Sequence, residues 1–330
     1  MSRYARQMLL PEVGSAGQAA IAAARVLVVG AGGLAAPALH YLAGAGVGHL
    51  TLVDGDVVSL SNLHRQPLFR EADVGRPKVE AAAETLRAMN ADCTFTPLPC
   101  ALDPANAANL VAGATLVLDC ADSFAASYIL SDICLDLGVP LVSASALGFA
   151  GYVGGFCGAA PSLRAVFPDL PDRAATCATA GVMGPVVGMI GAAQAQMALG
   201  VIIGQTPSPL GQLMQFDMQG MRSSGFRFDG APEPADGPKF IAPRDLTPQD
   251  FVIELRDSDE APVPVSQHAH RTSVAEFRQQ KSTPKDGQRA VFACRSGLRA
   301  WQAGAHLRSH WAGEITLIAM GDTPPTERQT

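Results

Sequence analysis

A glycine-rich turn directly after an apolar strand constrains this chain more than any other feature of its sequence. The run RVLVV at residues 25–29 passes straight into GAGGLA at residues 30–35, and a helical pattern follows. A strand, a tight turn and a helix in this order are typical of a nucleotide-binding unit. Glycines let the backbone approach a phosphate, and the amides at the helix N-terminus attract an anion. The turn therefore predicts phosphate contacts at Gly30, Gly32 and Gly33.

An acid follows the second predicted strand, which covers residues 49–53. Asp54 lies 24 residues after Gly30, and an acid at this spacing can accept hydrogen bonds from both ribose hydroxyls. The alternative interpretation is a carboxylate that caps the turn after the strand. The sequence leaves both interpretations open.

Two cations and an amide lie just downstream of the glycine turn. The segment at residues 61–66 is followed by Lys78 about a dozen residues on. Fixed positive charge beside a phosphate turn favours polyphosphate chemistry over hydride transfer. The candidate residues of the segment are Ser61, Asn62, Leu63, His64, Arg65 and Gln66.

Predicted strands and helices alternate along the first half of the chain. This alternation predicts an α/β fold with a doubly wound, mostly parallel Rossmann-like sheet, whose ligand lies at the carboxyl ends of the strands. Later strands near residues 152–157 and 213–217 would extend the sheet with antiparallel pairing. The predicted parallel strands are 25–29, 49–53, 94–98, 116–120 and 140–143, and the predicted helices are 34–45, 78–89 and 123–137.

Composition is that of a large and mildly acidic protein. The chain has 330 residues, of which 48% are hydrophobic, and a formal net charge of −6. A chain of this length buries a large core and is expected to form two domains. The acidity argues against a nucleic-acid partner and offers no basic membrane anchor. The N-terminal residues MSRY lack the apolar core of a secretory signal, so a cytoplasmic location is expected.

A stretch without charged residues, 182–204, is long enough to cross a bilayer. Pro185, Gln194, Gln196 and several glycines interrupt it, and no cluster of Lys or Arg flanks it. The predicted structure is a buried helix near a subunit interface, without membrane contact.

Seven motifs stand in order along residues 3–191. They are RYARQ (3–7), GAGGLA (30–35), DGD (54–56), SLSNLHRQ (59–66), GRPKVE (75–80), LDCADS (118–123) and TCATAGVMGPVVGMIG (176–191). In this order they closely resemble the MoeB/ThiF/HesA family of adenylyltransferases. Members of that family activate ubiquitin-like sulfur carriers in molybdopterin and thiamine synthesis and are relatives of the ubiquitin-activating enzymes. The resemblance covers roughly residues 1–228.

The resemblance implies a reaction at the α-phosphate of ATP. The attacking group is the C-terminal carboxylate of a carrier ending in Gly-Gly, and the products are an acyl adenylate and pyrophosphate. Because both reactants are anions, their approach requires fixed positive charge and a divalent cation. Arg65 and Lys78 match the phosphate-binding cations of the family, and Asp122 matches the acid that holds Mg²⁺. The nucleotide contacts that the resemblance implies are Gly30, Gly32, Gly33, Asp54, Asp56, Ser61, Asn62, Leu63, His64, Arg65, Gln66, Lys78, Asp122 and Ser123.

The resemblance also implies a homodimer and raises two questions about cysteines. Arg6 matches a residue that reaches across the dimer interface toward the phosphates. Cys177 matches the reactive cysteine of ubiquitin-activating relatives, and a thiol near a helix N-terminus can have a lowered pKa. The alternative for Cys177 is a small buried hydrophobe. Relatives commonly hold a structural zinc with two CxxC pairs. This chain has none and reads PSLRA (161–165) and MRSSG (221–225) where they would lie, so no zinc is predicted.

Composition changes again at residue 229. Residues 229–248 are rich in proline and glycine, which predicts an extended linker. The linker would join an ATP-binding adenylyltransferase domain at residues 1–228 to a small α/β domain at residues 249–330. In the small domain a strand at residues 290–293 leads into CRSGLR (294–299) and then a helix.

This strand, CxxGxR and helix resemble a rhodanese domain. In that family backbone amides surround a persulfide on the cysteine, and arginines hold the thiolate in its charged form. The resemblance implies sulfur transfer through Cys294, with a separate persulfide donor. The domain is short, and its entry motif reads Glu254, Leu255, Arg256 where Asp, a hydrophobe and Arg are usual. A trimmed domain is therefore expected, and a surface loop with an incidental cysteine is the alternative.

Two other functions are compatible with parts of the sequence. A nicotinamide-dependent oxidoreductase would share the glycine turn and Asp54, but it leaves Arg65, Lys78 and Asp122 unexplained. A noncatalytic scaffold would bind ATP only to hold the dimer together. The motifs do not distinguish a thiamine-type carrier from a molybdopterin-type carrier.

Overall fold

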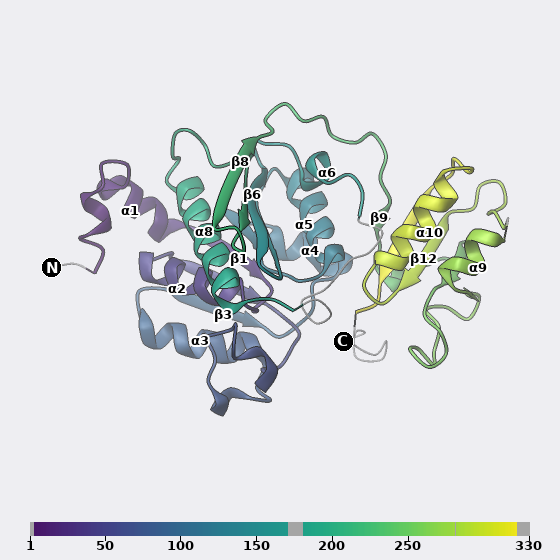
Figure 1. The fold of residues 1–330 in the computed structure, drawn as a ribbon, viewed down its shortest axis with the longest axis horizontal. Coiled ribbons are helices and arrows are strands. Elements are labelled where there is room, and N and C mark those ends of the chain that lie inside the picture. The colour runs from purple at the N-terminus through teal and green to yellow at the C-terminus, as the bar shows by residue number, and fades with distance from the viewer. Residues whose placement is uncertain (1–2, 171–180, 281, 322–330) are drawn as a thin grey trace.

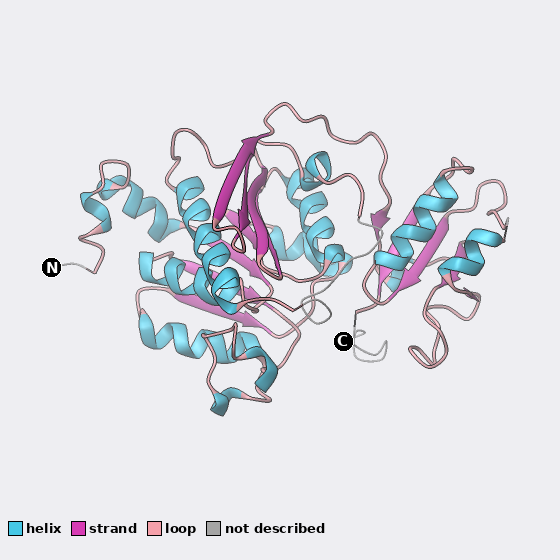
Figure 2. Cartoon of the chain, viewed as in Figure 1, coloured by secondary structure: helices cyan, strands magenta, loops and turns pink. Residues whose placement is uncertain are grey.

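The computed structural model describes residues 3–170, 181–280 and 282–321, and these residues form two sheets with helices on their faces (Figures 1 and 2). The strands of the larger sheet are β1 (Arg25–Val29), β2 (His49–Val53), β3 (Thr94–Leu98), β4 (Leu116–Asp119), β5 (Pro140–Leu147), β6 (Ala150–Cys157), β7 (Gln212–Asp217) and β8 (Arg222–Arg227). Its helices are α1 (Gly14–Ala23), α2 (Ala35–Ala45), α3 (Lys78–Met89), α4 (Pro104–Val111), α5 (Phe124–Leu137), α6 (Leu163–Val166) and α8 (Gly184–Ile202), with 3₁₀ turns η1 (Gln7–Leu9), η2 (Leu60–Asn62) and η3 (Glu71–Asp73).

The larger sheet has the strand order β3-β2-β1-β4-β5-β6-β7-β8. Strands β3 to β5 are parallel to one another, while β6, β7 and β8 join them with antiparallel pairing. The strand order reverses direction at β1, which pairs with β2 on one side and β4 on the other. The predicted fold class, a doubly wound sheet with an antiparallel extension, is confirmed.

The apolar run of β1 forms a central strand because both of its faces are buried. Val26 and Val28 belong to a core shared with α2, α3 and α8, whereas Leu27 and Val29 belong to a core shared with α4 and α5. Side chains alternate between the faces of a strand, so a strand covered on both sides must be apolar throughout. This strand therefore directs the glycine turn at its end into a crevice between two helical layers.

Helix α8 packs against α2, β5 and β6. By length and composition alone it could cross a membrane, and half of its most apolar window is buried inside the protein. Gln194 fastens it to the sheet, because its Nε2 donates to the backbone oxygens of Asp119 (2.8 Å) and Val142 (3.0 Å). The stretch predicted as a buried helix is thus a helix of the core, and its place near a subunit interface stays a prediction.

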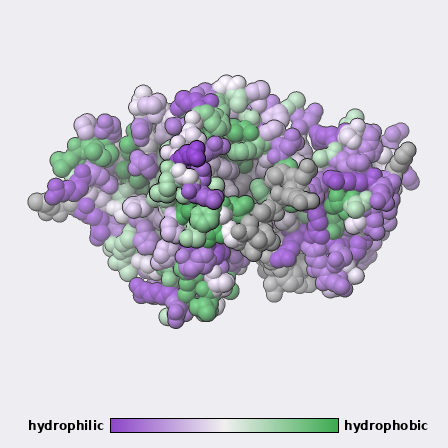
Figure 3. Space-filling model, in the orientation of Figure 1, coloured by the Kyte–Doolittle hydropathy of each residue, from purple (hydrophilic) through white to green (hydrophobic). Residues whose placement is uncertain are grey.

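The smaller sheet and its helices are called the second unit here. Its strands run in the order β11-β10-β12-β13-β9 and are all parallel. The face of this unit seen in Figure 3, at the right, is largely hydrophilic. Its elements are β9 (Lys239–Phe240), η4 (Pro243–Asp245), β10 (Phe251–Glu254), β11 (His270–Arg271), α9 (Val274–Gln279), β12 (Ala290–Cys294), α10 (Leu298–Arg308) and β13 (Ile315–Ala319).

The second unit contains part of the stretch predicted as a linker. Lys239 and Phe240 of β9 pair with Thr316 and Leu317 of β13, so the chain joins the second sheet before residue 249. Phe240 is buried in the same core cluster as Leu27 and Phe292. The two units therefore share apolar packing at their junction.

Candidate active site

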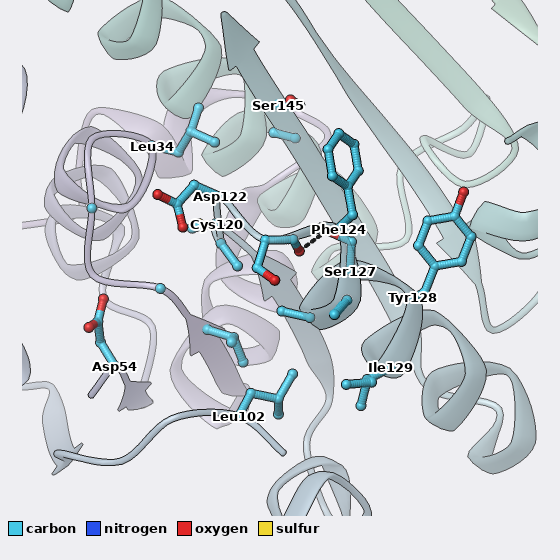
Figure 4. Close-up of a pocket in the computed structure, with 18 of the residues that line it drawn as sticks. Leu34, Asp54, Leu102, Cys120, Asp122, Phe124, Ser127, Tyr128, Ile129 and Ser145 are labelled. Atoms are coloured by element: carbon cyan, nitrogen blue, oxygen red, sulfur yellow. Dashed lines mark hydrogen bonds between the residues drawn. The ribbon is translucent and has the colours of Figure 1, made fainter. Parts of the chain in front are cut away.

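A cavity of approximately 1100 Å³ lies at the carboxyl ends of β1, β2, β4 and β5 (Figure 4). This edge, where the strand order reverses, is the usual ligand position in an open α/β sheet. The cavity brings together residues that are far apart in the sequence. Those predicted from the sequence that line it are Gly30, Gly32, Gly33, Asp54, Asp56, Asn62, Arg65, Gln66, Lys78, Asp122 and Ser123.

The glycine turn is closely packed against the residues that follow β4 and against helix α8. Gly30 has φ +89°, and a Cβ built on it would lie 2.6 Å from the backbone oxygen of Cys120. A Cβ on Gly33 would lie 2.6 Å from Cγ1 of Val187. Only glycine fits both the positive φ and the contact at residue 30. The turn thus exposes backbone to the cavity and has the form of a phosphate cradle.

Asp54 fastens this turn. Its carboxylate accepts hydrogen bonds from the backbone N–H groups of Ala31 (2.6 Å) and Asp56 (2.7 Å). Burial raises the pKa of Asp54, and the positive charge of Lys78 opposes that effect. The turn-capping interpretation is therefore observed. It does not exclude a ribose contact, because a carboxylate has about four lone-pair positions and this one also lines the cavity.

Lys78 supplies a cation that is largely shielded from water. It is the first residue of α3, and its Nζ lies 2.7 Å from Oδ2 of Asp56. The Lys78 side chain is 8% exposed, whereas that of Asp56 is 72% exposed. A charge in this position interacts strongly with an anion that enters the cavity, because little water screens it.

The segment around η2 presents Arg65 and Gln66 to the cavity. Arg65 is held within its own segment, where its Nη1 donates to the Ser61 backbone oxygen (3.2 Å) and lies 2.9 Å from Nε2 of His64. Gln66 is buried against the glycine turn. Its Oε1 has no hydrogen-bond partner in the described part of the chain. A buried orphan acceptor beside a phosphate cradle fits a site that is completed by a ligand.

Ser61, Leu63 and His64 do not line the cavity among the described residues. Ser61 and His64 instead contact Arg65, which does line the cavity, and Leu63 packs on the apolar core. Arg6 is exposed, precedes η1 and is also absent from the cavity lining. Cys177 lies outside the described residues.

Asp119 and Asp122 follow β4 and have different environments. Asp119 is fully buried and accepts hydrogen bonds from Ser143 Oγ (2.7 Å) and the Ala121 N–H (3.2 Å). Burial raises its pKa to about 6, although those hydrogen bonds oppose the effect. Asp122 instead lines the cavity, and in Figure 4 its carboxylate and that of Asp54 lie on the side away from Phe124 and Tyr128.

Asp122 fits a role as a magnesium ligand together with ATP. The described residues contain no group of three His, Cys, Asp or Glu side chains that could hold a metal ion by themselves. Mg²⁺ in phosphate sites commonly takes one or two carboxylates and completes its shell with phosphate oxygens and water. Asp122 lines the cavity together with the carboxylates of Asp54, Asp56 and Asp169, so a site with one or two protein carboxylates is compatible with that pattern.

The raised pKa of Asp119 makes the stability of the protein pH-dependent. The folded pKa of about 6 exceeds the ordinary value of 3.8, so Asp119 binds its proton more tightly in the folded state. The stability that this tighter proton binding contributes is fully present below about pH 4 and is lost as the pH rises through 6. The difference corresponds to up to about 3 kcal/mol at neutral pH. We expect the free energy of unfolding of Asp119→Asn, minus that of wild type, to be larger at pH 7 than at pH 4.5 when both are measured in urea. A wild-type to variant difference that is equal at both pH values would contradict this.

The cavity also has an apolar wall and a contribution from the second unit, neither of which was predicted from the sequence. The second unit contributes Phe240, Arg295, Ala319 and Gly321 to this cavity. These residues could not be predicted to meet, because their spacing along the chain carries no local pattern. Its apolar wall is formed by Leu102, Phe124, Tyr128, Ile129, Leu163, Phe167 and Leu170.

Cys294 lies at the end of β12, in a loop of backbone amides. Its Sγ accepts hydrogen bonds from the N–H groups of Gly297 (3.1 Å) and Ala300 (3.3 Å). Burial raises the pKa of the Cys294 thiol, while the Ala300 hydrogen bond and the charge of Arg299 oppose that rise. The expectation that arginine holds the thiolate in its charged form is therefore met only in part. Arg299 also forms an ion pair with Glu260, in which Nη1 of Arg299 lies 2.8 Å from Oε2 of Glu260.

Residues 161–165, where relatives would have their first cysteine pair, are held by hydrogen bonds and an ion pair. Ser162 donates through its backbone N–H to Glu233 Oε1 (2.6 Å) and through its hydroxyl to Glu233 Oε2 (2.5 Å). Arg164 forms a bidentate pair with Asp132. Residues 221–225 end the turn into β8 and form most of that exposed edge strand. The expected absence of zinc stays a prediction.

Comparisons with known proteins give a consistent picture. The sequence profile of the ThiF family matches residues 4–236. The "Adenylyltransferase and sulfurtransferase MOCS3" of Bos taurus is 48% identical over 218 residues, which are 65% of this chain and 48% of that protein. The "Adenylyltransferase and sulfurtransferase UBA4" of Yarrowia lipolytica is 46% identical over 210 residues, which are 61% of this chain and 52% of that protein. The matches thus span about half the length of these two relatives.

An archaeal relative is matched over most of its length. The "SAMP-activating enzyme E1" of Haloferax volcanii is 40% identical over 223 residues, 67% of this chain and 83% of that protein. Among solved structures, E. coli MccB with ATP superposes with a TM-score of 0.60 at 21% identity and covers 71% of this chain and 73% of its own. PaaA superposes with a TM-score of 0.59 at 25% identity, covering 68% and 72%. The likeness to MccB shows the fold alone.

Proposed function

The chain belongs to the ThiF family, and from this premise we propose that it is an ATP-dependent adenylyltransferase for a ubiquitin-like sulfur carrier ending in Gly-Gly. One observation carries the proposal: a single cavity combines a glycine cradle with Arg65, Lys78 and Asp122. Relatives named as adenylyltransferases and sulfurtransferases support it. So does the archaeal relative named as an E1 enzyme for SAMP.

The reaction joins two anions. An oxygen of the carrier's terminal carboxylate forms a bond to the α-phosphorus of ATP, the bond to the bridging oxygen breaks, and pyrophosphate leaves with the electron pair. Lys78 and Arg65 stabilise the negative charge that accumulates on the phosphate oxygens. Mg²⁺ bound with ATP would be held by Asp122 and would neutralise part of the same charge.

The remaining residues orient the nucleotide. The backbone of the glycine turn approaches the phosphates, and Gln66 offers its orphan Oε1 to a donor on the substrate or a bound water. Asp54 keeps the turn in place and retains acceptor positions for the ribose hydroxyls. Positioning of this kind supplies much of the catalysis in phosphoryl and nucleotidyl transfer.

We propose that Arg6 completes the site of a partner subunit. Arg6 is exposed and does not line the cavity of its own chain. A residue that acts across the interface of a symmetric dimer has this appearance in a single chain. In such a dimer each cavity would receive a further cation besides Arg65 and Lys78.

We propose a second step at Cys294. A persulfide donor transfers its outer sulfur to the Cys294 thiolate and leaves as a thiol. The terminal sulfur of this persulfide attacks the adenylated carbonyl, the bond from that carbon to the phosphate oxygen breaks, and AMP leaves. A second thiol then attacks the Cys294 sulfur, which releases the carrier as a thiocarboxylate and leaves Cys294 in a disulfide. Cys177 or a small external thiol would supply this last reactant.

ATP–pyrophosphate exchange tests the first step. We expect exchange of labelled pyrophosphate into ATP in the presence of Mg²⁺ and a carrier ending in Gly-Gly, and none without a carrier. The exchange rate is then compared across thiamine-type, molybdopterin-type and other carriers, and the carrier that gives the fastest exchange is identified as the partner. A carrier that lacks its last glycine is the matched control. Absence of exchange with every carrier, together with tight NADH binding, would replace this proposal with an oxidoreductase.

A further inference from the structure

The Cys294 loop, residues 294–300, contacts the wall of the nucleotide cavity. A Cβ built on Gly297 would lie 3.3 Å from Cβ of Ala125 and 2.7 Å from the ring of Phe240. Ala125 lies in the first turn of α5, which begins directly after Asp122 and Ser123. Arg295 of the loop lines the same cavity as Asp122. Cys294 itself is fully buried and is not among the described residues that line the cavity, but the loop that it heads therefore borders the nucleotide site.

One buried arginine connects the segments of this junction. Arg164 of α6 forms a bidentate pair with Asp132 of α5, at 2.5 Å from Nε to Oδ1 and 2.8 Å from Nη2 to Oδ2. Its Nη2 also donates to the backbone oxygen of Pro238 (3.2 Å), one residue before β9. Charge-assisted bidentate bonds fix both direction and distance. Arg164 thus ties α5 and α6 to the entry of the second unit.

Two aromatic rings complete the environment of Arg164. Its Cζ lies 4.7 Å from the ring centroid of Tyr128 on α5 and 5.6 Å from that of Trp301 on α10. The two rings are in contact with each other, with centroids 5.2 Å apart. Trp301 follows the Cys294 loop immediately in sequence. The guanidinium therefore packs against a side chain from each unit, and cation–π attraction joins them.

The environment of Arg164 is specific for a planar guanidinium. Its third nitrogen, Nη1, has no hydrogen-bond partner in the described ranges and is buried next to Gly237. Burial of an unsatisfied N–H donor lowers the stability of the protein. The other contacts of the Arg164 side chain must offset this cost. Lysine could not reproduce the fork or the stacking.

We propose that Arg164 is a positioning residue, which fixes the second unit on α5 so that the Cys294 loop is held beside the nucleotide cavity. This inference rests on the proposed function, since it explains how an adenylated carrier meets Cys294 without leaving the cavity. Arg164 would act in the transfer of sulfur from Cys294 to the adenylated carrier and not in adenylation. Arg164 is accordingly dispensable for exchange with ATP and for sulfur loading of Cys294.

The test compares three reactions of the full-length protein. The variants are Arg164→Lys and the double variant Arg164→Met with Asp132→Asn, which leaves no unpaired buried charge. The matched control is Arg227→Ala, which removes an arginine paired with Asp229 on the surface. The readouts are ATP–pyrophosphate exchange, persulfide loading of Cys294 from polysulfide by mass spectrometry, and single-turnover thiocarboxylate formation from the loaded protein.

We expect both Arg164 variants to keep exchange and loading within about twofold of wild type and to lose at least about tenfold in thiocarboxylate formation. Hydrogen exchange should rise at residues 124–128 and 294–300 in these variants and not in Arg227→Ala. Unchanged thiocarboxylate formation overturns the positioning role. An equal fall in all three reactions also overturns it, because Arg164 would then be merely structural. If wild type shows no exchange, the proposed function fails, while hydrogen exchange at the junction still decides whether Arg164 docks the second unit.

Discussion

Lys78→Ala is expected to lower kcat/KM for carrier-dependent ATP–pyrophosphate exchange by at least about 100-fold, which corresponds to about 3 kcal/mol of lost transition-state stabilisation. The Lys78 side chain is only 8% exposed, so water cannot replace its charge at the phosphates. Its partner Asp56 is 72% exposed and remains solvated after the substitution. The loss is therefore expected in activity, with little change in the free energy of unfolding.

Two further substitutions sharpen this prediction. Lys78→Met keeps the packing of the aliphatic stem and should be as inactive as Lys78→Ala, since charge and not volume is required. Lys285→Ala removes a lysine that is exposed in the second unit and should retain full exchange. Exchange within about threefold of wild type in Lys78→Met would contradict a role for this cation in the transition state.

The central sheet could be predicted because its strands are apolar on both faces. The run at residues 25–29 has no polar alternation that could be confused with a helix, and a glycine turn closes it. β8 was missed for the opposite reason. All six of its residues are exposed, so its sequence carries no burial pattern. Helix α1 was also missed, because small residues dominate it and give little amphipathic contrast.

The polar half of the site could be predicted because its residues lie in short motifs after successive strands. Parallel strands bring their carboxyl ends to one edge, so Asp54, Lys78 and Asp122 converge without further information. The position of Arg164 could not be predicted. Its partners Asp132, Pro238 and Trp301 belong to three separate segments, and a single arginine outside any motif is ordinarily a solvated surface group.

Asp119 shows a related limit. Its motif, LDCADS, contains two acids, and only the family resemblance, not the residue pattern, assigns the ligand-facing role to Asp122. The structure separates them through strand geometry: Asp119 ends β4 and is buried against Ser143, while Asp122 reaches the cavity. Roles of neighbouring carboxylates are set by burial, which depends on the packing of β5 beside β4.

The largest stability loss is expected at the buried ion pair of the second unit. Glu254 at the end of β10 is fully buried, and its Oε1 and Oε2 lie 2.8 Å and 2.6 Å from Nε and Nη2 of Arg256. Its carboxylate also accepts from the backbone N–H of Val265 (2.9 Å). Glu254→Ala leaves the buried Arg256 guanidinium without a counter-charge, so we expect the free energy of unfolding to fall by about 3–5 kcal/mol. Urea unfolding and differential scanning calorimetry measure the effect.

The matched control is another glutamate that pairs with an arginine, but at the surface. Glu84 is 68% exposed and lies 2.5 Å from Arg76, so Glu84→Ala should cost less than about 1 kcal/mol. The double variant Glu254→Leu with Arg256→Met removes both buried charges and should recover part of the stability lost in Glu254→Ala. A loss in Glu254→Ala no larger than in Glu84→Ala would contradict this account of the pair. The pair would then be a replaceable contact, and the glutamate at the position where aspartate is usual would not anchor the second unit.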